Sequence, residues 1–463
     1  MPAHSVAGMA KVAQVFRCGE CGWSTAKWVG RCAECQAWGS LDEVTRSRPG
    51  IGPRPAAQQA RPIASVGLEA AQSRPTGVGE FDRALGGGLV QGAVVLLAGE
   101  PGVGKSTLLL EVAARWAATA GPALYVTGEE SAAQVRLRAE RTGALCDGLL
   151  LAAETDLAAV ISHIDQVRPS LLVLDSVQTV SRSDIDGVAG GVTQVREVAG
   201  ALIRVAKDRG VVTVLVGHVT KDGSIAGPRV LEHLVDVVLQ FEGERHSRLR
   251  MVRAVKNRYG PADEVGCFDL SDTGIVSVPD PTGLFLSRHA HPVPGTCVTV
   301  TLEGRRPLLA EVQALVASSP LATPRRATSG LDSSRVAMVL AVLERRGDLS
   351  LRNSDVYAAT VGGARLTEPA GDLALLVAVA SGMRDLPVPP GLVAIGEVGL
   401  AGEIRRVTGT QRRLAEAERM GFDRALVPPD PGPVPAGIHA VEVADVRSAL
   451  NAARRPTVVL PSS

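Results

Sequence analysis

The chain has 463 residues, 45% of them hydrophobic, and a formal net charge of +1 at pH 7. This length predicts two or three domains with apolar cores, and the near-zero charge excludes a protein that is basic all over, so any nucleic-acid surface must be local. No apolar run reaches the roughly 18 residues of a membrane span, and residues 1–15 lack the apolar segment of a signal peptide. We therefore expect a cytoplasmic protein without a membrane partner.

Four of the seven cysteines form two Cys-x-x-Cys pairs near the N-terminus, separated by ten residues: Cys18, Cys21, Cys32 and Cys35. Two such pairs supply the four thiolates of a closed, structural Zn²⁺ site. We predict a zinc finger at residues 16–45, because a module of about 30 residues hardly folds without a metal. A redox pair or incidental cysteines are the alternatives. The odd number of cysteines, seven, argues against a disulfide framework and favours a protein of the reducing cytosol.

Aromatic and basic residues accompany these cysteines: Trp23, Trp28, Trp38, Arg17, Lys27 and Arg31. Such residues are typical of a face that binds nucleic acid or a partner, yet small modules also need tryptophans as a miniature core. The sequence leaves both interpretations open. Residues 46–75 follow as a predicted linker, which begins with a stretch rich in Pro, Gly, Ala, Gln and Arg.

A phosphate-binding loop comes next, in the pattern G-x-x-x-x-G-K-[ST]: Gly99, Glu100, Pro101, Gly102, Val103, Gly104, Lys105, Ser106 and Thr107. An apolar run of strand length at 94–98 precedes it, and a helical pattern at 108–118 follows it. The glycines let backbone N–H groups surround phosphates at the helix N-terminus. Lys105 is predicted to reach the β- and γ-phosphates of ATP, and Ser106 to hold Mg²⁺.

Short apolar runs then alternate with amphipathic segments. The runs are 124–126, 171–174, 211–216 and 235–239, and the clearest amphipathic segments are 131–141 and 193–207. This alternation predicts βαβ units, hence an α/β fold with a mostly parallel sheet that is covered on both faces. We assign residues 76–275 to this ATPase domain.

Acidic residues follow two of the predicted strands. Asp175 ends an apolar strand in the Walker B pattern and is predicted to bind Mg²⁺. Glu129 and Glu130 follow the strand after the P-loop helix, where a carboxylate polarises the attacking water. The alternative is that both glutamates are acidic residues favoured at a helix N-terminus by the helix dipole. For Glu130 this alternative and catalysis stay equally open. For Glu129 we favour catalysis.

Further polar segments follow other strands. His218 lies in the segment 217–221, where a polar residue can sense the γ-phosphate. Two loops, at 181–194 and 221–229, are interpreted either as ligand-binding loops or as plain connections. The sequence Lys-Asn-Arg-Tyr-Gly at 256–260 follows Arg248, Arg250 and Arg253, so positive charge is expected to concentrate there. A basic solvated turn is the alternative.

Together these residues resemble the bacterial RadA/Sms family of DNA repair proteins over nearly the whole chain. The segment 256–260 matches that family's K-N-R-F-G signature, with Tyr259 in place of Phe. The resemblance implies a RecA-like core, assembled as a homo-hexameric ring on DNA with ATP between subunits. Lys256 and Arg258 would then act on a neighbour's nucleotide. It also implies movement on single-stranded and branched DNA, with branch migration of recombination intermediates alongside the RecA recombinase.

The C-terminal region, residues 282–453, looks like the proteolytic domain of Lon. The Lon serine position falls at Ala370, and the lysine position falls at Gln411, so the Ser-Lys dyad is absent. The resemblance implies an inactive scaffold, with either a basic face or an ordinary solvated helix surface from Arg405, Arg406, Arg412 and Arg413.

The leading hypothesis is therefore a DNA-dependent ATPase that drives branch migration. An ATP-dependent Lon-like protease, a scaffold that holds nucleotide without turnover, and a RecA-like strand-exchange protein are the alternatives.

Overall fold

The computed structural model describes residues 15–18, 20, 23–25, 27–44, 62–65, 71–218, 230–243, 248–287, 291–321 and 323–454. The chain divides into two compact units, residues 1–67 and residues 68–463. Among the described residues, no helix combines the length and apolar character needed to cross a membrane.

The first unit is built around a small antiparallel sheet in the order β2-β1-β3. Its elements are β1 (Val15–Cys18), β2 (Ser24–Thr25), β3 (Leu41–Val44) and a 3-10 turn, η1 (Ile63–Ser65). Cys18, Cys32 and Leu41 are buried, with Phe16 and Trp23 packed against them. This core is too small to stabilise the module by burial alone, as expected for a metal-dependent fold.

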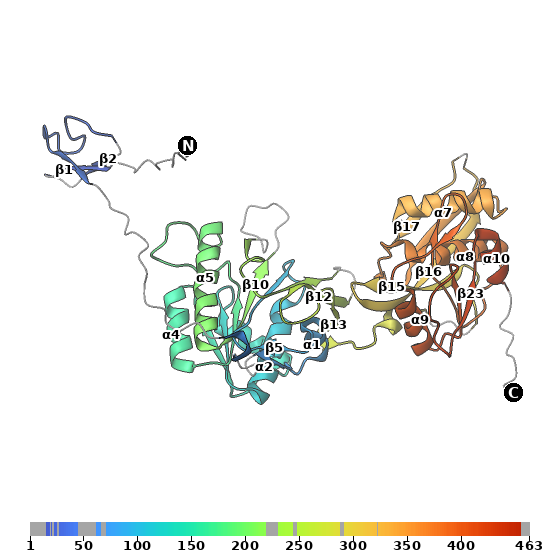
Figure 1. Ribbon diagram of the computed structural model, residues 1–463, viewed down its shortest axis with the longest axis horizontal. Coiled ribbons are helices and arrows are strands. Elements are labelled where there is room, and N and C mark those ends of the chain that lie inside the picture. Colours follow the sequence, from blue (N-terminus) through green and yellow to red (C-terminus); the bar gives the residue numbers. More distant parts are fainter. Residues whose placement is uncertain are drawn as a thin grey trace, which may run out of the picture. The chain divides into compact units, whose positions relative to one another are not determined.

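The N-terminal half of the second unit is a nine-stranded sheet in the order β14-β13-β12-β11-β6-β10-β9-β7-β8 (Figure 1). Its strands are β6 (Val94–Gly99), β7 (Ala123–Thr127), β8 (Leu149–Ala153), β9 (Leu171–Asp175), β10 (Val212–His218), β11 (Val237–Glu242), β12 (Leu249–Asn257), β13 (Val265–Ser271) and β14 (Gly274–Ser277). The six strands from β11 to β8 are parallel, and β12 to β14 are antiparallel. A short pair, β4 (Ser73–Arg74) and β5 (Leu89–Val90), precedes them.

Helices cover both faces of this sheet: α1 (Gly79–Leu85), α2 (Lys105–Thr119), α3 (Ala132–Arg141), α4 (Leu157–Val167) and α5 (Val192–Arg209). Val95 and Leu97 of β6 pack with α1 and α2, whereas Val94 and Leu96 pack with α4 and α5. Because both faces are buried, the strand is apolar at every position. The predicted α/β fold and the predicted strand before the P-loop are confirmed.

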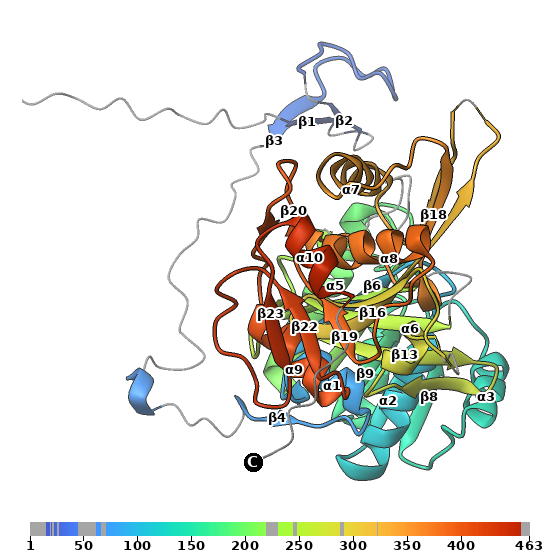
Figure 2. The same ribbon diagram turned by 90° about the vertical axis from the view of Figure 1, so that its right-hand side faces the viewer.

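The C-terminal half of the second unit is a seven-stranded mixed sheet in the order β17-β18-β16-β15-β19-β22-β23. Its elements are α6 (Thr282–Phe285), β15 (Thr296–Glu303), β16 (Arg306–Ser318), β17 (Arg326–Ser329), α7 (Ser333–Arg346), β18 (Ser354–Thr360), η4 (Val361–Gly363), η5 (Pro369–Gly371), α8 (Asp372–Arg384), β19 (Leu392–Ala394), β20 (Glu397–Val398), β21 (Ile404–Arg405), α9 (Thr410–Arg419), β22 (Arg424–Val427), β23 (His439–Glu442) and α10 (Val446–Ala452). Helices α7, α8 and α10 pack on one face, and α9 packs on the other (Figure 2).

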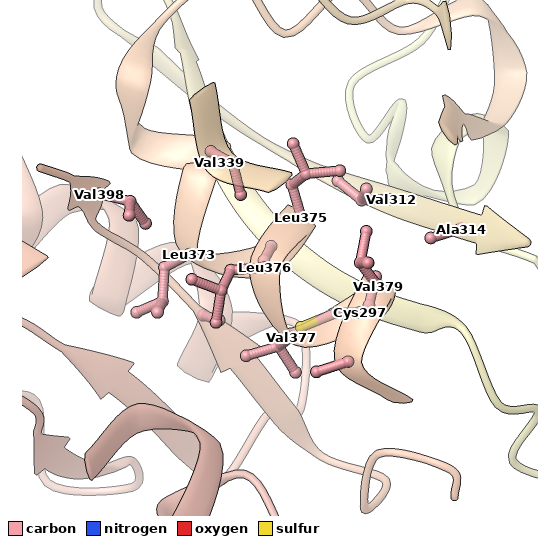
Figure 3. Packing of buried hydrophobic residues seen from close by; sticks show 14 of the residues in the cluster. Cys297, Val312, Ala314, Val339, Leu373, Leu375, Leu376, Val377, Val379 and Val398 are labelled. Carbon is pink, nitrogen blue, oxygen red and sulfur yellow. The ribbon is translucent and has the colours of Figure 1, made fainter. Parts of the chain in front are cut away.

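Helix α8 is the centre of this second core. Leucines and valines point from α8 toward β15, β16 and α7, where they meet Cys297, Val312 and Val339 (Figure 3). Ala370, at the position where the Lon resemblance places a nucleophile, is 1% exposed in η5. Its carbonyl accepts a hydrogen bond from the Gly396 N–H at 3.0 Å. A buried methyl group offers no nucleophile, which agrees with an inactive scaffold.

The turn between β15 and β16 joins the two halves of the second unit. Arg306, 5% exposed, forms a buried ion pair with Glu80 at the start of α1 and donates to the carbonyls of Val265 and Pro279. Nearby, Arg253 of β12 pairs with Glu303 at 2.6 Å. The Arg306–Glu80 pair fixes the geometry of the junction, because either residue without its partner would be an unpaired buried charge.

The sequence left open whether Arg405, Arg406, Arg412 and Arg413 form a basic face or an ordinary solvated helix surface, and Arg413 fits neither. Arg413 is fully buried and makes a bidentate pair with Glu368, with N···O distances of 2.6 and 2.7 Å. Arg405 pairs with Glu403 and Arg406 pairs with Asp430 at the surface. Arg413 is therefore a structural residue, and two of the other three arginines are neutralised by adjacent carboxylates.

Candidate nucleotide and zinc sites

The P-loop and the predicted acidic residues meet at the carboxyl ends of four neighbouring parallel strands. In the sheet register, Gly99 of β6 lies opposite His218 of β10, and Thr127 of β7 lies opposite Asp175 of β9. Parallel strands place their carboxyl ends at one edge, where such sheets bind ligands. The fold thus brings residues that are up to 119 positions apart, Gly99 and His218, into one site.

The P-loop is shaped to receive phosphates. Gly102 has φ of 80° and Gly104 has φ of 111°, conformations that L side chains rarely adopt. A Cβ on Gly102 would meet nothing within 4 Å, so the backbone is open to solvent at this position. Lys105 donates to the carbonyls of Gly99 at 2.9 Å and Glu100 at 2.8 Å. Burial lowers the pKa of Lys105 to about 8, against the opposing effect of Asp175 and Glu129.

Glu129 is held in place by two hydrogen bonds to its Oε1 atom. His218 Nε2 lies 2.9 Å away, and Ser176 Oγ donates at 2.6 Å. The hydrogen bond from His218 is the largest of the effects that lower the pKa of Glu129 to about 2. The carboxylate is therefore ionised at neutral pH, and His218 Nε2 must be the donor. A base this weak suits orienting and polarising a water molecule better than taking its proton outright.

Glu130 has a different environment from Glu129. Its carboxylate pairs with Arg138 of helix α3, and its backbone N–H donates to Thr127 Oγ1 at 3.1 Å. The capping box of α3 is made by Ser131 and Gln134, so Glu130 lies just outside the helix. Arg138 belongs to the last turn of α3, so the Glu130 carboxylate is occupied by an ion pair that runs along the helix.

Asp175 lies beside the P-loop lysine at the end of β9, 6% exposed. The Tyr125 hydroxyl donates to its Oδ2 at 2.5 Å, which orients the carboxylate from the neighbouring strand. Ser176, which holds Glu129, follows it directly. Carboxylate and hydroxyl oxygens suit Mg²⁺, so Asp175 and Ser106 fit the predicted metal role chemically.

Lys256 and Arg258 lie at the opposite end of the sheet from the P-loop. Asn257 pairs with Val237, the first residue of β11, whereas Gly99 pairs with Phe241, four residues further along the same strand. Four residues of strand span about 13 Å. The two cations are therefore separated from the chain's own nucleotide site by the length of the strand.

A buried carboxylate organises this opposite end. Asp236, 5% exposed, accepts from the Val94 N–H at 3.0 Å, from Lys207 at 2.6 Å and from Arg258 at 3.3 Å. Burial alone would raise the pKa of Asp236, but the hydrogen bond from Lys207 helps to keep it below its usual value. Lys256 donates to two backbone carbonyls at 2.7 and 2.8 Å. Arg258 is 57% exposed in its side chain, so it remains accessible to a partner.

The expected concentration of positive charge before Lys256 is wrong. Successive strand residues point to opposite faces, so Arg250 and Arg253 of β12 lie on different faces of the sheet. Arg248 pairs with Asp269, Arg253 pairs with Glu303, and Arg250 is buried. Arg250 Nε donates to the carbonyl of Val103 within the P-loop at 3.1 Å, a contact that sequence reasoning missed.

The two loops singled out from the sequence have different outcomes. Gln194, within α5, donates through Nε2 to the carbonyls of Arg182 and Ile185, so it holds the loop between β9 and α5. Residues 219–229, which include Lys221 and the second loop, lie outside the described part of the chain. His218 itself carries a buried Nδ1 atom with no hydrogen-bond partner among the described residues.

Three of the four predicted zinc ligands converge in the first unit. The sulfur atoms of Cys18, Cys32 and Cys35 lie within 4.8 Å of one another, and those of Cys18 and Cys35 are 3.6 Å apart. Tetrahedral Zn–S bonds of about 2.3 Å require sulfur atoms about 3.8 Å apart, so the geometry fits zinc. Cys21 lies outside the described residues.

Comparison with known proteins places the chain in a family. The DNA repair protein RadA of Mycolicibacterium smegmatis is 56% identical over 458 residues, which cover 96% of this chain and 97% of that protein. The chain belongs to the RadA family of DNA repair proteins. The RadA proteins of Pseudomonas aeruginosa and Bacillus subtilis are 48% and 44% identical, each with 96% of this chain and 99% of the relative covered.

Family models agree with this assignment. A model described as an AAA domain matches residues 80–224, and one described as a rubredoxin metal binding domain matches residues 16–43. Among solved structures, a KaiC-like protein from Pyrococcus horikoshii is 23% identical, with a TM-score of 0.38 over 45% of this chain and 99% of that one. The two family models and the curated relatives make this chain a P-loop ATPase with a zinc ribbon, with ATP and Zn²⁺ as its cofactors.

Proposed function

We propose that this member of the RadA family is a single-stranded-DNA-dependent ATPase that drives branch migration of recombination intermediates. The single observation that carries the proposal is the separation of its charged groups. Lys105, Glu129 and Asp175 lie at one end of the sheet, whereas Lys256 and Arg258 lie at the other. A nucleotide at the P-loop would therefore receive these two cations only from a second copy of the chain.

Each residue at the P-loop end has a defined role in this proposal. Backbone N–H groups of 99–107 bind the phosphates, and Lys105 leaves its two carbonyl partners to bind the β- and γ-phosphates. Ser106 and Asp175 would hold Mg²⁺, which when bound would supply positive charge beside the phosphates. Glu129 orients the attacking water, and His218, hydrogen-bonded to Glu129, senses whether a γ-phosphate is present.

The opposite end supplies the subunit interface. Contacts between opposite ends of successive copies are heterologous, and they generate a closed ring when the rotation closes. Arg258, now paired with Asp236, would turn to the neighbour's phosphates and stabilise the charge of the transition state, a role typically worth 10³–10⁵ in rate. We propose a homo-hexamer around DNA, which works with the RecA recombinase in the cytoplasm.

Two other functions make different predictions. A Lon-like protease needs a hydroxyl and an amine, whereas Ala370 is a buried methyl group and Gln411 is an amide, so we expect no ATP-dependent cleavage of casein. A strand-exchange protein would require homologous DNA, whereas a branch-migration motor also moves through heterologous sequence.

ATP hydrolysis with and without single-stranded DNA tests the proposal, followed by branch migration on a four-strand junction. We expect stimulation of the wild type by DNA and loss of both activities in Lys105→Ala. Arg447→Ala, which removes a cation 69% exposed on α10, is the matched control and should keep both. Hydrolysis that is indifferent to DNA would contradict the proposed function.

A further inference from the structure

The three tryptophans of the zinc module, which the sequence could not separate, have different environments. Trp23 packs against the buried cysteines. Trp28 and Trp38 are 62% and 76% exposed, among the most exposed large hydrophobic residues of the described chain. The miniature core therefore needs only one of the three indoles, and two large aromatic surfaces are left in contact with water.

A short hairpin fixes the two exposed rings beside each other. The Gly39 N–H donates to the Gly30 carbonyl at 3.0 Å, and Arg31 and Trp38 pair across the turn. A Cβ built on Gly30 would lie 3.7 Å from Cη2 of Trp28 and 4.0 Å from Cζ3 of Trp38. Both indoles thus meet at a residue that has no side chain.

The positively charged side chain of Arg31 lies over one of these two rings. The Arg31 guanidinium carbon lies 5.6 Å from the centre of the Trp38 ring, within cation–π range. Gln36 holds Arg31 in that position, because its backbone carbonyl and its Oε1 accept hydrogen bonds at 2.9 and 2.6 Å. Lys27, also exposed, precedes Trp28 directly. We call Lys27, Trp28, Arg31 and Trp38 the indole surface.

We propose that the indole surface binds single-stranded nucleic acid by stacking bases on Trp28 and Trp38. Unpaired bases present flat apolar faces, and indoles with a neighbouring guanidinium are a recurrent way to hold them without sequence preference. This site belongs to the first unit of the chain and the ATPase sheet to the second. The inference rests on the proposed function and deepens it by giving the zinc module a ligand of its own.

The local charge sets the character of this binding. The module at 16–45 carries three cations and four carboxylates, namely Arg17, Lys27, Arg31, Glu20, Glu34, Asp42 and Glu43. A Zn²⁺ bound by four thiolates adds two further negative charges. The sixteen residues that follow, 46–61, carry four arginines and no acid. Binding by the indole surface should therefore depend mainly on stacking and less on salt than phosphate binding does.

Tryptophan fluorescence of the full chain tests the proposal without nucleotide present. Short oligo-dT should quench the tryptophan fluorescence of the wild type. The anisotropy of dye-labelled oligo-dT, which does not depend on the replaced tryptophans, should show that Trp28→Ala with Trp38→Ala loses binding. Each substitution should weaken oligo-dT binding roughly five- to 150-fold, the range measured for loss of base stacking. Trp28→Phe with Trp38→Phe retains flat rings and should restore most of the affinity. Leu400→Ala, which removes an apolar group 69% exposed elsewhere, is the control.

Zinc content, measured on every variant, separates loss of binding from loss of the fold. Unchanged oligo-dT affinity in the zinc-loaded double alanine variant would overturn the inference. So would DNA-stimulated ATP hydrolysis by a wild type that shows no quenching, a result that would leave the proposed function intact. A double variant that keeps oligo-dT binding but loses binding of a recombinase protein would assign the surface to protein contact instead.

Discussion

Replacing Glu129 with Gln tests the assignment of the catalytic carboxylate. Both hydrogen bonds of Glu129, from Ser176 at 2.6 Å and His218 at 2.9 Å, go to Oε1. Glutamine retains an oxygen that can accept them but replaces the charged Oε2 with an amide. Positioning is therefore kept while the negative charge that polarises water is lost. Loss of such a group costs about 10² to 10⁴ in rate, or about 3–5 kcal/mol of activation free energy.

The assay is steady-state ATP hydrolysis with saturating single-stranded DNA, together with fluorescent-nucleotide binding. Glu129→Gln should lower kcat by that factor and leave nucleotide affinity within about threefold, because the P-loop contacts are untouched. Glu130→Gln, whose carboxylate pairs with Arg138, is the matched control. A normal kcat for Glu129→Gln, combined with a large loss for Glu130→Gln, would refute the assignment. Because the pKa of Glu129 is about 2, its titration should leave the rate unchanged between pH 5 and pH 8.

Three further predictions concern binding and stability. Burial lowers the pKa of Lys105 to about 8, and phosphates bind its protonated form, so ATP affinity should fall between pH 7 and pH 9 with proton uptake measurable by calorimetry; a flat profile would contradict this. Arg306→Met leaves the Glu80 carboxylate buried and should lower the free energy of unfolding in urea by about 3–5 kcal/mol, whereas Arg405→Met at an exposed pair should change it by less than about 1 kcal/mol. Removing zinc with a chelator should unfold the zinc module, seen in the fluorescence of Trp23, which packs against the buried cysteines, while residues 68–463 keep their urea midpoint; retained structure without metal would contradict the zinc assignment.

Local signals in the sequence predicted much of the candidate nucleotide site. The P-loop, Glu129 and Asp175 each follow an apolar run, and parallel strands bring such positions to one edge without knowledge of the partners. Sequence reasoning missed the contacts that complete the site, namely Ser176 and His218 on Glu129, Tyr125 on Asp175, and Arg250 on the P-loop. These depend on strand order, which a single sequence leaves open.

Charged and aromatic residues were harder to place because their burial depends on distant partners. Arg413 belongs to a run of arginines that reads as a surface, yet Glu368, 45 positions away, neutralises it in the core. The three tryptophans of the zinc module are chemically identical, and only their positions relative to the cysteine turns separate Trp23 from the other two. In both cases contacts with residues distant in the sequence decide whether the side chain is buried, and the local sequence pattern does not show those contacts.

Mixing two inactive variants tests most directly whether each nucleotide site is shared between copies. Lys105→Ala lacks the P-loop cation, and Arg258→Ala lacks the cation at the opposite end of the sheet. Combined at equal amounts with single-stranded DNA, they should regain hydrolysis at about one interface in four, since an intact P-loop then meets an intact Arg258 by chance pairing. Activity in Arg258→Ala alone, or none in the mixture despite subunit exchange, would contradict the account.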